Sequence, residues 1–182
     1  MLNRLTGASV LVEDKLFATL DPTVRRLTLP NQQDLLLVDT VGFIRKLPHL
    51  LVEAFKSTLE ETLTADFLIE VIDVTGSQIE EHHRTTREVL NDIGAGDKPV
   101  ITVLNKIDCV ADAIERRRIA HKYPDAILAS SLTREGLPEL GQALAHELDA
   151  ALRLHDLLIP HGRYDIVAKL HRTSAILKES YD

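Results

Sequence analysis

The stretch of sequence that decides the fold reads Val100-Ile101-Thr102-Val103-Leu104-Asn105-Lys106-Ile107-Asp108. Its first five residues are apolar or β-branched, which favours a strand covered on both faces, as in a parallel sheet. The polar residues follow at the point where this strand would end. Ligands of open parallel sheets bind outside the carboxyl ends of the strands. The stretch therefore predicts a buried strand that carries Asn105, Lys106 and Asp108 to a binding site.

Three other apolar runs have the same form, a short buried-strand pattern closed by a polar residue. They are Leu35–Val38 before Asp39, Phe67–Ile72 before Asp73, and Ala126–Ala129 before Ser130. Between and beside these runs, apolar residues at spacings of three and four predict helices over 49–64, 78–93, 112–121 and 137–153. Alternating strands and helices indicate an α/β fold with a mostly parallel sheet and right-handed crossovers.

The ends of the expected helices carry their own signals. Ser77 followed by Glu80 is a capping-box pattern, and Pro138 suits the first turn of a helix. Residues 1–153 are expected to form the main domain. In residues 154–182, Leu157–Pro160 suggests a short strand and 163–179 a helix, too little to close a core of their own.

Composition limits the possible partners. Hydrophobic residues make up 45% of the 182 residues and the formal net charge is −7, which argues against free DNA or RNA as the main partner. Arg25–Arg26 and Arg116–Arg118 are basic runs, but such runs are usually solvated faces. No apolar run reaches the roughly 18 residues that cross a bilayer. We expect a cytoplasmic, monomeric protein.

Other candidate sites are weak. His82 and His83 are adjacent, so on a helix they point about 100° apart and do not share a face as metal ligands would. A solvated pair is the simpler interpretation. Cys109 is the single cysteine, which excludes an internal disulfide, and it is expected to be a small packing residue.

Three strand ends carry polar signals in a fixed order. Asp39-Thr40-Val41-Gly42 can hold Mg²⁺ through water and direct a backbone N–H at a terminal phosphate. The Asp108 carboxylate can accept hydrogen bonds from N1–H and the exocyclic amine of guanine, a donor pair that adenine lacks. The alternative for 105–108 is an ordinary turn and helix cap. Ser130-Ser131-Leu132 offers backbone N–H groups to guanine O6, although alone it is little more than a loop.

The order of these signals resembles the P-loop GTPases, and three segments resemble the HflX branch in particular. They are residues 16–23 (LFATLDPT), 39–48 (DTVGFIRKLP) and 51–61 (LVEAFKSTLEE). The resemblance implies a three-layer GTPase fold, GTP or GDP and Mg²⁺ as ligands, and the large ribosomal subunit as partner. It also implies that residues 154–182 begin a small α+β domain.

The resemblance also implies roles for single residues. Thr19 would contact Mg²⁺ near the γ-phosphate, Asp39 would contact Mg²⁺, and Gly42 the γ-phosphate. The guanine site would comprise Asn105, Lys106, Asp108, Ser130, Ser131 and Leu132. Phe43 stands where many GTPases have a glutamine that orients water, so slow hydrolysis that depends on a partner is expected, and no catalytic residue is assigned.

The sequence contains no G-x-x-x-x-G-K-[ST] loop, which such enzymes use to bind phosphates. Asn3–Gly7 resembles the family segment just after that loop. The fold would then lack its first, central strand, between the strands ending at Asp39 and Asp73. We expect a gap of about 9.6 Å or two unpaired strand edges there, low stability, and nucleotide binding that is weakened or lost.

Three functional hypotheses remain open. The first is a GTP hydrolase that acts on the ribosome. The second is a remnant that binds the ribosome or a protein without nucleotide. The third is a chain whose missing strand and loop are supplied by another polypeptide.

Overall fold

The computed structural model describes residues 1–6, 23–29, 31–40, 61–76, 78–152, 155–174 and 176–180. The contacts divide the chain into two units, Met1–Ala151 and Leu152–Asp182. Thr19, Gly42 and Phe43 lie outside the described residues, as does most of the helix expected over 49–64, of which residues 61–64 are helical. None of the helices in the described ranges is long and apolar enough to cross a membrane.

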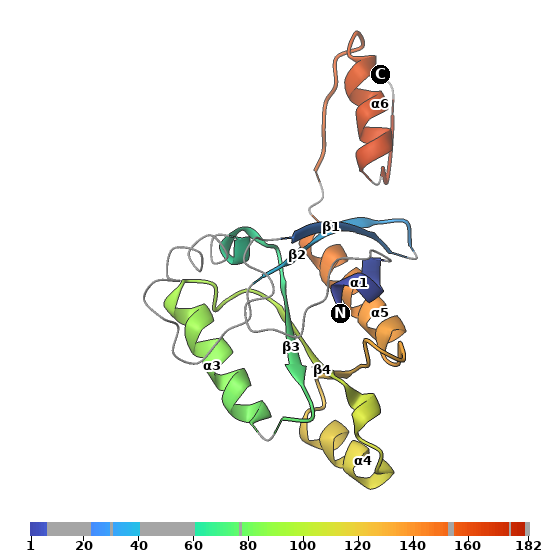
Figure 1. The fold of residues 1–182 in the computed structure, drawn as a ribbon. Coiled ribbons are helices and arrows are strands. Elements are labelled where there is room, and N and C mark those ends of the chain that lie inside the picture. Colours follow the sequence, from blue (N-terminus) through green and yellow to red (C-terminus); the bar gives the residue numbers. More distant parts are fainter. Residues whose placement is uncertain are drawn as a thin grey trace. The chain divides into compact units, whose positions relative to one another are not determined.

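The centre of the first unit is a three-stranded parallel sheet (Figure 1). Its strands are β3 (Leu68–Asp73), β4 (Val100–Asn105) and β5 (Ile127–Leu128), with β4 in the middle. The helices between and after them are α3 (Ile79–Asp92), α4 (Ala113–Lys122) and α5 (Leu137–Ala151). The predicted α/β alternation is confirmed in this part of the chain, and the helix ends fall within two residues of those expected.

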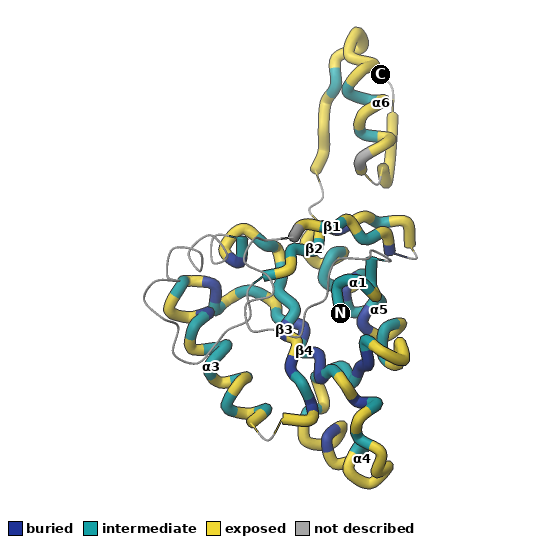
Figure 2. The backbone as a smooth tube through the Cα atoms, viewed as in Figure 1, coloured by how far each residue is buried: buried dark blue, intermediate teal, exposed yellow. Residues whose placement is uncertain are grey.

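Strand β4 is covered on both faces. On one face Ile101 and Val103 pack with Leu140 and Leu144 of α5, and on the other Leu104 packs with side chains from β3 and α4. Val103 and Leu104 are fully buried, and Figure 2 shows this dark stretch through the middle of the unit. The two-sided core holds the carboxyl end of β4 in place.

A separate antiparallel hairpin contains β1 (Thr23–Thr28) and β2 (Asp34–Asp39). The strand at Leu35–Val38 is confirmed, but its expected place in a parallel sheet is wrong for the described residues, because β2 pairs with β1. Strand β1 was not predicted, because Arg25 and Arg26 suggested a solvated run. Arg26 lies opposite Leu36 in the register and forms an exposed ion pair with Asp34 at 3.6 Å.

Strands β2 and β3 belong to different sheets. The hairpin is still joined to the main core, because Leu35 shares one buried cluster with Val103 and Leu140. Hydrophobic packing therefore connects the sheets where backbone pairing does not.

Several local predictions are corrected by the structure. Helix α3 begins after Gln78, which makes no side-chain capping bond, and Ser77 of the predicted capping box lies outside the described residues. In the second unit, residues 157–160 form no strand, since a strand needs a hydrogen-bonded neighbour. The helix expected over 163–179 is shorter, α6 (Tyr164–Thr173), and ends where Ser174 adopts an extended backbone.

Candidate functional site

The chain turns sharply at the carboxyl end of β4. Lys106 adopts a left-handed backbone conformation with φ of 67°, which is uncommon for a residue with a side chain. It leads into a short 3-10 helix, η2 (Ile107–Cys109), whose Ile107 is buried and donates its N–H to the carbonyl of Ala129 at 3.1 Å. The turn fixes Asp108 beside the loop that follows β5.

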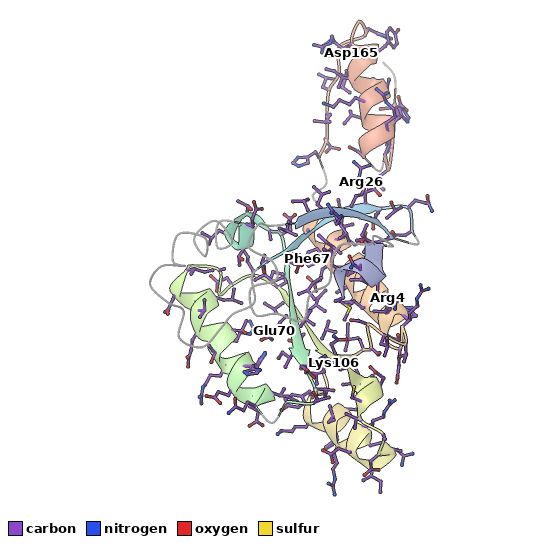
Figure 3. The ribbon with its side chains drawn as sticks, in the orientation of Figure 1. Arg4, Arg26, Phe67, Glu70, Lys106 and Asp165 are labelled. Atoms are coloured by element: carbon purple, nitrogen blue, oxygen red, sulfur yellow. The ribbon has the colours of Figure 1, made fainter. Side chains whose placement is uncertain are left out.

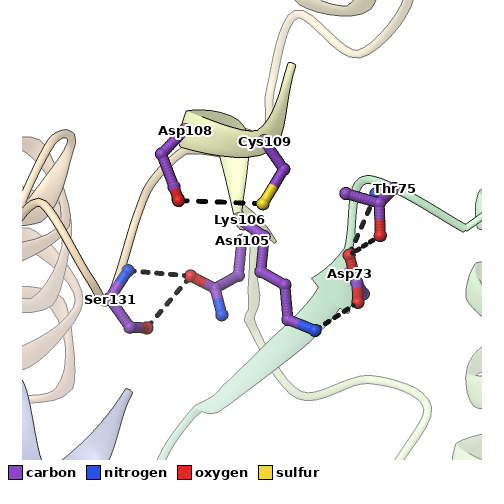
Figure 4. Close-up of polar contacts among 7 residues, drawn as sticks. All are labelled: Asp73, Thr75, Asn105, Lys106, Asp108, Cys109 and Ser131. Atoms are coloured by element: carbon purple, nitrogen blue, oxygen red, sulfur yellow. Dashed lines mark hydrogen bonds and ion pairs between the residues drawn. The ribbon is translucent and has the colours of Figure 1, made fainter. Parts of the chain in front are cut away.

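Asn105 joins the two loops. Its side-chain oxygen accepts hydrogen bonds from the backbone N–H and the hydroxyl of Ser131, both at 3.0 Å (Figure 4). The predicted site residues at the ends of β4 and β5 are thus brought together. Asn105 is more than a local turn or cap residue, because its bonds reach the next strand's loop.

The loop after β5 is closed by its own hydrogen bonds. Ser130 is fully buried, and its hydroxyl oxygen accepts from the N–H groups of Leu132 at 3.2 Å and Thr133 at 3.0 Å. The N–H of Ser130 itself donates to the carbonyl of Glu135 at 2.8 Å. The N–H groups of Ser130, Ser131 and Leu132 are therefore all engaged within the protein in this structure.

Gly136 ends this loop in a left-handed conformation, with φ of 74°. A Cβ atom at this position would lie 2.0 Å from the carbonyl oxygen of Leu128. Only glycine fits such a close approach without displacing backbone. The packing of this turn keeps the loop against the end of β5.

The carboxylate of Asp108 has an unsatisfied acceptor. Its Oδ1 is buried and makes no hydrogen bond to any described residue, while Oδ2 accepts a weak bond from the Cys109 thiol at 3.7 Å. The nearby Ser130 hydroxyl, which does not complete a hydrogen bond to Oδ1 in this geometry, is the main cause that lowers the pKa of Asp108, and burial opposes it. The group is therefore a charged acceptor, suited to N–H donors of a ligand. Cys109 is exposed, so its expected role as a packing residue is wrong.

Asp73, predicted only as the residue that ends a strand, contributes to the same edge of the sheet. It lies opposite Asn105 in the register and forms an ion pair with the Lys106 ammonium at 2.7 Å. Its other oxygen accepts from the N–H and hydroxyl of Thr75 at 2.9 and 2.7 Å. Burial tends to raise the pKa of Asp73, but the Lys106 and Thr75 bonds outweigh it and the pKa is lowered.

The expected phosphate and Mg²⁺ residues are described only in part. Asp39 is exposed at the end of β2, in the hairpin sheet, while Thr19 and Gly42 lie outside the described ranges. The amine of Met1 has a lowered pKa because burial outweighs the attraction of Asp39. Within the described ranges, no three acidic, histidine or cysteine side chains gather as a metal site would require.

A second polar cluster lies inside the parallel-sheet region, away from the strand ends. Glu70 of β3 is buried, and its Oε2 meets Nδ1 of His83 at 2.6 Å and the hydroxyl of Thr102 at 3.3 Å. Figure 3 places Glu70 on β3. Its Oε1 makes no hydrogen bond to the described residues. The expected solvated histidine pair is thus half wrong, since His82 is exposed but His83 binds Glu70.

Comparison with known proteins identifies the family. The GTPase HflX of Akkermansia muciniphila is 45% identical over 185 residues, covering 100% of this chain and 42% of the relative. This chain belongs to the HflX family of GTPases. The Escherichia coli GTPase HflX is 40% identical over 180 residues, covering 98% of this chain and 42% of its own length. The chain thus spans less than half the length of these HflX relatives.

The wider comparisons agree with this HflX assignment. Residues 1–106 match the model of a family described as 50S ribosome-binding GTPases. A GTP-binding protein from Sulfolobus solfataricus, solved in complex with GDP, superimposes with a TM-score of 0.66 at 31% identity, covering 83% of this chain and 48% of that chain. The predicted GTPase-type fold and the family resemblance are confirmed.

Proposed function

We propose that this HflX-family chain is the guanine-nucleotide-binding and GTP-hydrolysing part of a cytoplasmic, ribosome-associated GTPase. The observation that carries the proposal is the charged Asp108, whose Oδ1 is buried near the Ser130 hydroxyl and completes no hydrogen bond with a described residue. A buried acceptor without a hydrogen-bond donor carries a free-energy cost in the folded chain. A ligand N–H would remove this cost. Guanine offers the carboxylate a pair of N–H donors that adenine lacks.

The base would lie against the loops that follow β4 and β5. Asp108 would accept hydrogen bonds from N1–H and the exocyclic amine, while the stem of Lys106 would lie along the base. Guanine O6 would need an N–H from Ser130, Ser131 or Leu132. The bond from Leu132 to the Ser130 hydroxyl, at 3.2 Å, is the longest of their three internal bonds. We infer that Leu132 N–H turns to the ligand first.

The phosphate half of the site is proposed from the resemblance. Asp39 and Thr19 would contact Mg²⁺, and Gly42 the γ-phosphate. With Phe43 in place of a water-orienting glutamine, hydrolysis would be slow and would depend on a partner. We propose the large ribosomal subunit as that partner, and we assign no catalytic residue.

These 182 residues contain no phosphate-binding loop motif. Such a loop supplies several charge-assisted bonds, each worth about 1.5–3 kcal/mol. Losing four would cost about 6 kcal/mol, roughly ten-thousand-fold in affinity. We therefore propose that the 182 residues by themselves bind GTP weakly and do not turn it over. The main alternative is binding to the ribosome or a protein without nucleotide, which predicts co-sedimentation with ribosomes unaffected by GTP.

The test is a titration with a fluorescent GDP analogue and Mg²⁺, on the 182 residues and on a version preceded by a relative's strand and phosphate-binding loop. We expect tight binding only by the extended version. In that version, Asp108→Asn should weaken GDP and favour xanthosine diphosphate, whose C2 oxygen accepts from the new amide. Asp97→Asn, an exposed control, should change neither. An Asp108→Asn variant that keeps its preference for GDP would contradict the proposal.

A further inference from the structure

Arg116 differs from the other arginines of its run. The sequence suggested that Arg116–Arg118 form a solvated face, and Arg118 does so, pairing with Glu115 along the exposed side of α4. The Arg116 side chain is only 33% exposed and lies against the loops at the strand ends. Arg116 therefore has a structural role that the sequence of this run does not reveal.

The guanidinium of Arg116 makes three hydrogen bonds, each 2.8 Å long. Nε donates to the carbonyl of Val110 and Nη2 to the carbonyl of Ile107, on either side of Asp108. Nη1 donates to the carboxylate of Glu135. Glu135 belongs to the loop after β5, where its carbonyl accepts the N–H of Ser130. One planar group thus ties the Asp108 turn to the Ser130 loop.

The guanidinium is suited to this role because its donors are fixed in one plane and its charge persists at any working pH. A lysine ammonium cannot reach three acceptors spread in this way. Asn105 also links these two loops, through its bonds to Ser131, and the Ser130 hydroxyl lies near the Asp108 carboxylate. Without Arg116, the Asp108 turn would keep the Asn105 link and the Ile107–Ala129 backbone bond on its strand side, and would lose the link to Glu135 on its helix side.

We propose that Arg116 is a positioning residue for guanine selection, holding the Asp108 carboxylate at a set distance from the Ser130–Leu132 loop. This inference rests on the proposed function, since it assumes that guanine binds between these loops. Arg116 itself would not touch the base. Its loss would move Asp108 relative to the loop and weaken the bond to the exocyclic amine of guanine.

Inosine diphosphate separates this effect from general destabilisation. It lacks the exocyclic amine but is otherwise identical to GDP, so the ratio of the two affinities reports the Asp108–amine bond. The ratio does not depend on the fraction of protein that is folded. One charge-assisted hydrogen bond predicts a preference for GDP of about tenfold or more.

The experiment titrates the full 182-residue chain with GDP and with inosine diphosphate in Mg²⁺, following backbone amide shifts so that millimolar affinities can be measured. Arg116→Met should reduce the preference for GDP to within about twofold of unity. Arg117→Met, the exposed neighbouring control, should retain the wild-type ratio. Glu135→Gln, which keeps the two carbonyl bonds of Arg116, should give an intermediate ratio.

The outcomes are distinguishable. A wild-type chain that does not prefer GDP would overturn the proposed function, and the role of Arg116 with it, before any variant is compared. A wild-type preference that Arg116→Met retains would overturn the role of Arg116 alone. A preference lost equally in Arg116→Met and Arg117→Met would also overturn it, because the effect would then follow helix charge rather than the three bonds.

Discussion

Strands β4 and β2 look alike in sequence but have different surroundings. Each is a short apolar run that ends in a polar residue. In β4, Val103 and Leu104 point to opposite faces and both are fully buried, whereas in β2 Leu35 is buried and Leu36 is 65% exposed. The difference comes from neighbours: β4 has parallel strands on both sides, and β2 pairs with β1. An apolar run therefore predicts a strand more securely than it predicts the cover of each face.

The same contrast separates the two halves of the expected nucleotide site. The residues carried by β4 and β5 are joined by bonds between loops, such as Asn105 to Ser131. Asp39, carried by β2, lies in the other sheet. The two-sided core thus lies beneath the part of the site that we propose selects the base.

The largest effect is expected for Leu104→Ala in β4. A fully buried leucine truncated to alanine costs about 2–5 kcal/mol, because the transfer energy is lost and a cavity remains. Leu36→Ala in β2 is the matched control and should change the unfolding free energy by no more than about 0.5 kcal/mol. Denaturant unfolding measures both. Equal losses would show that the hairpin is covered as fully as the parallel sheet.

A smaller effect is expected for His83→Ala, which removes the closest partner of the buried Glu70 carboxylate. Leaving that group less satisfied should destabilise the fold by about 1–3 kcal/mol. His82→Ala, an exposed substitution on the same helix, should stay within about 0.5 kcal/mol. Thermal unfolding measures the midpoint temperatures of the two variants. Equal midpoints would mean that the Glu70–His83 bond contributes nothing to the parallel-sheet region.

The smallest effect concerns the pH dependence of stability at Asp73. Its pKa is lowered in the folded protein, so the carboxylate contributes stability above the unfolded value of 3.8, and this is lost as pH falls through the folded pKa. Because the ion pair with Lys106 is half exposed, the contribution should be less than about 1 kcal/mol. Asp73→Asn should flatten the stability profile slightly between about pH 5 and pH 3. Urea melts at several pH values measure the unfolding free energy. If it changed with pH equally in the variant and in the unmodified chain, this prediction would be refuted.

The sequence predicted what depends on neighbours along the chain. The run 100–108 indicated both a buried strand and the polar turn after it, because apolar pattern and strand ends are local features. Strand β1 was not predicted because its two adjacent arginines interrupt the alternation of polar and apolar residues that is typical of a strand. Leu157–Pro160 was wrongly expected to be a strand because its pattern cannot show whether a partner strand is present.

The contacts between distant segments at the proposed base site were harder to predict. Asp73 meets Lys106, and Arg116 meets Glu135, only after parallel strands bring distant segments together. If the register between the two expected strands had been known, Asp73 could have been placed opposite Asn105. No feature of the Arg116–Arg118 run distinguishes the residue that turns inward.

The most direct test of the base site compares GDP with ADP, each with Mg²⁺, by amide shifts of the full 182-residue chain. Guanine selection by Asp108 predicts weak binding of GDP, with shifts concentrated in residues 105–109 and 130–133, and little response to ADP. Equal responses to the two nucleotides, or shifts confined to other residues, would contradict the assignment of the β4 and β5 strand ends as a guanine site.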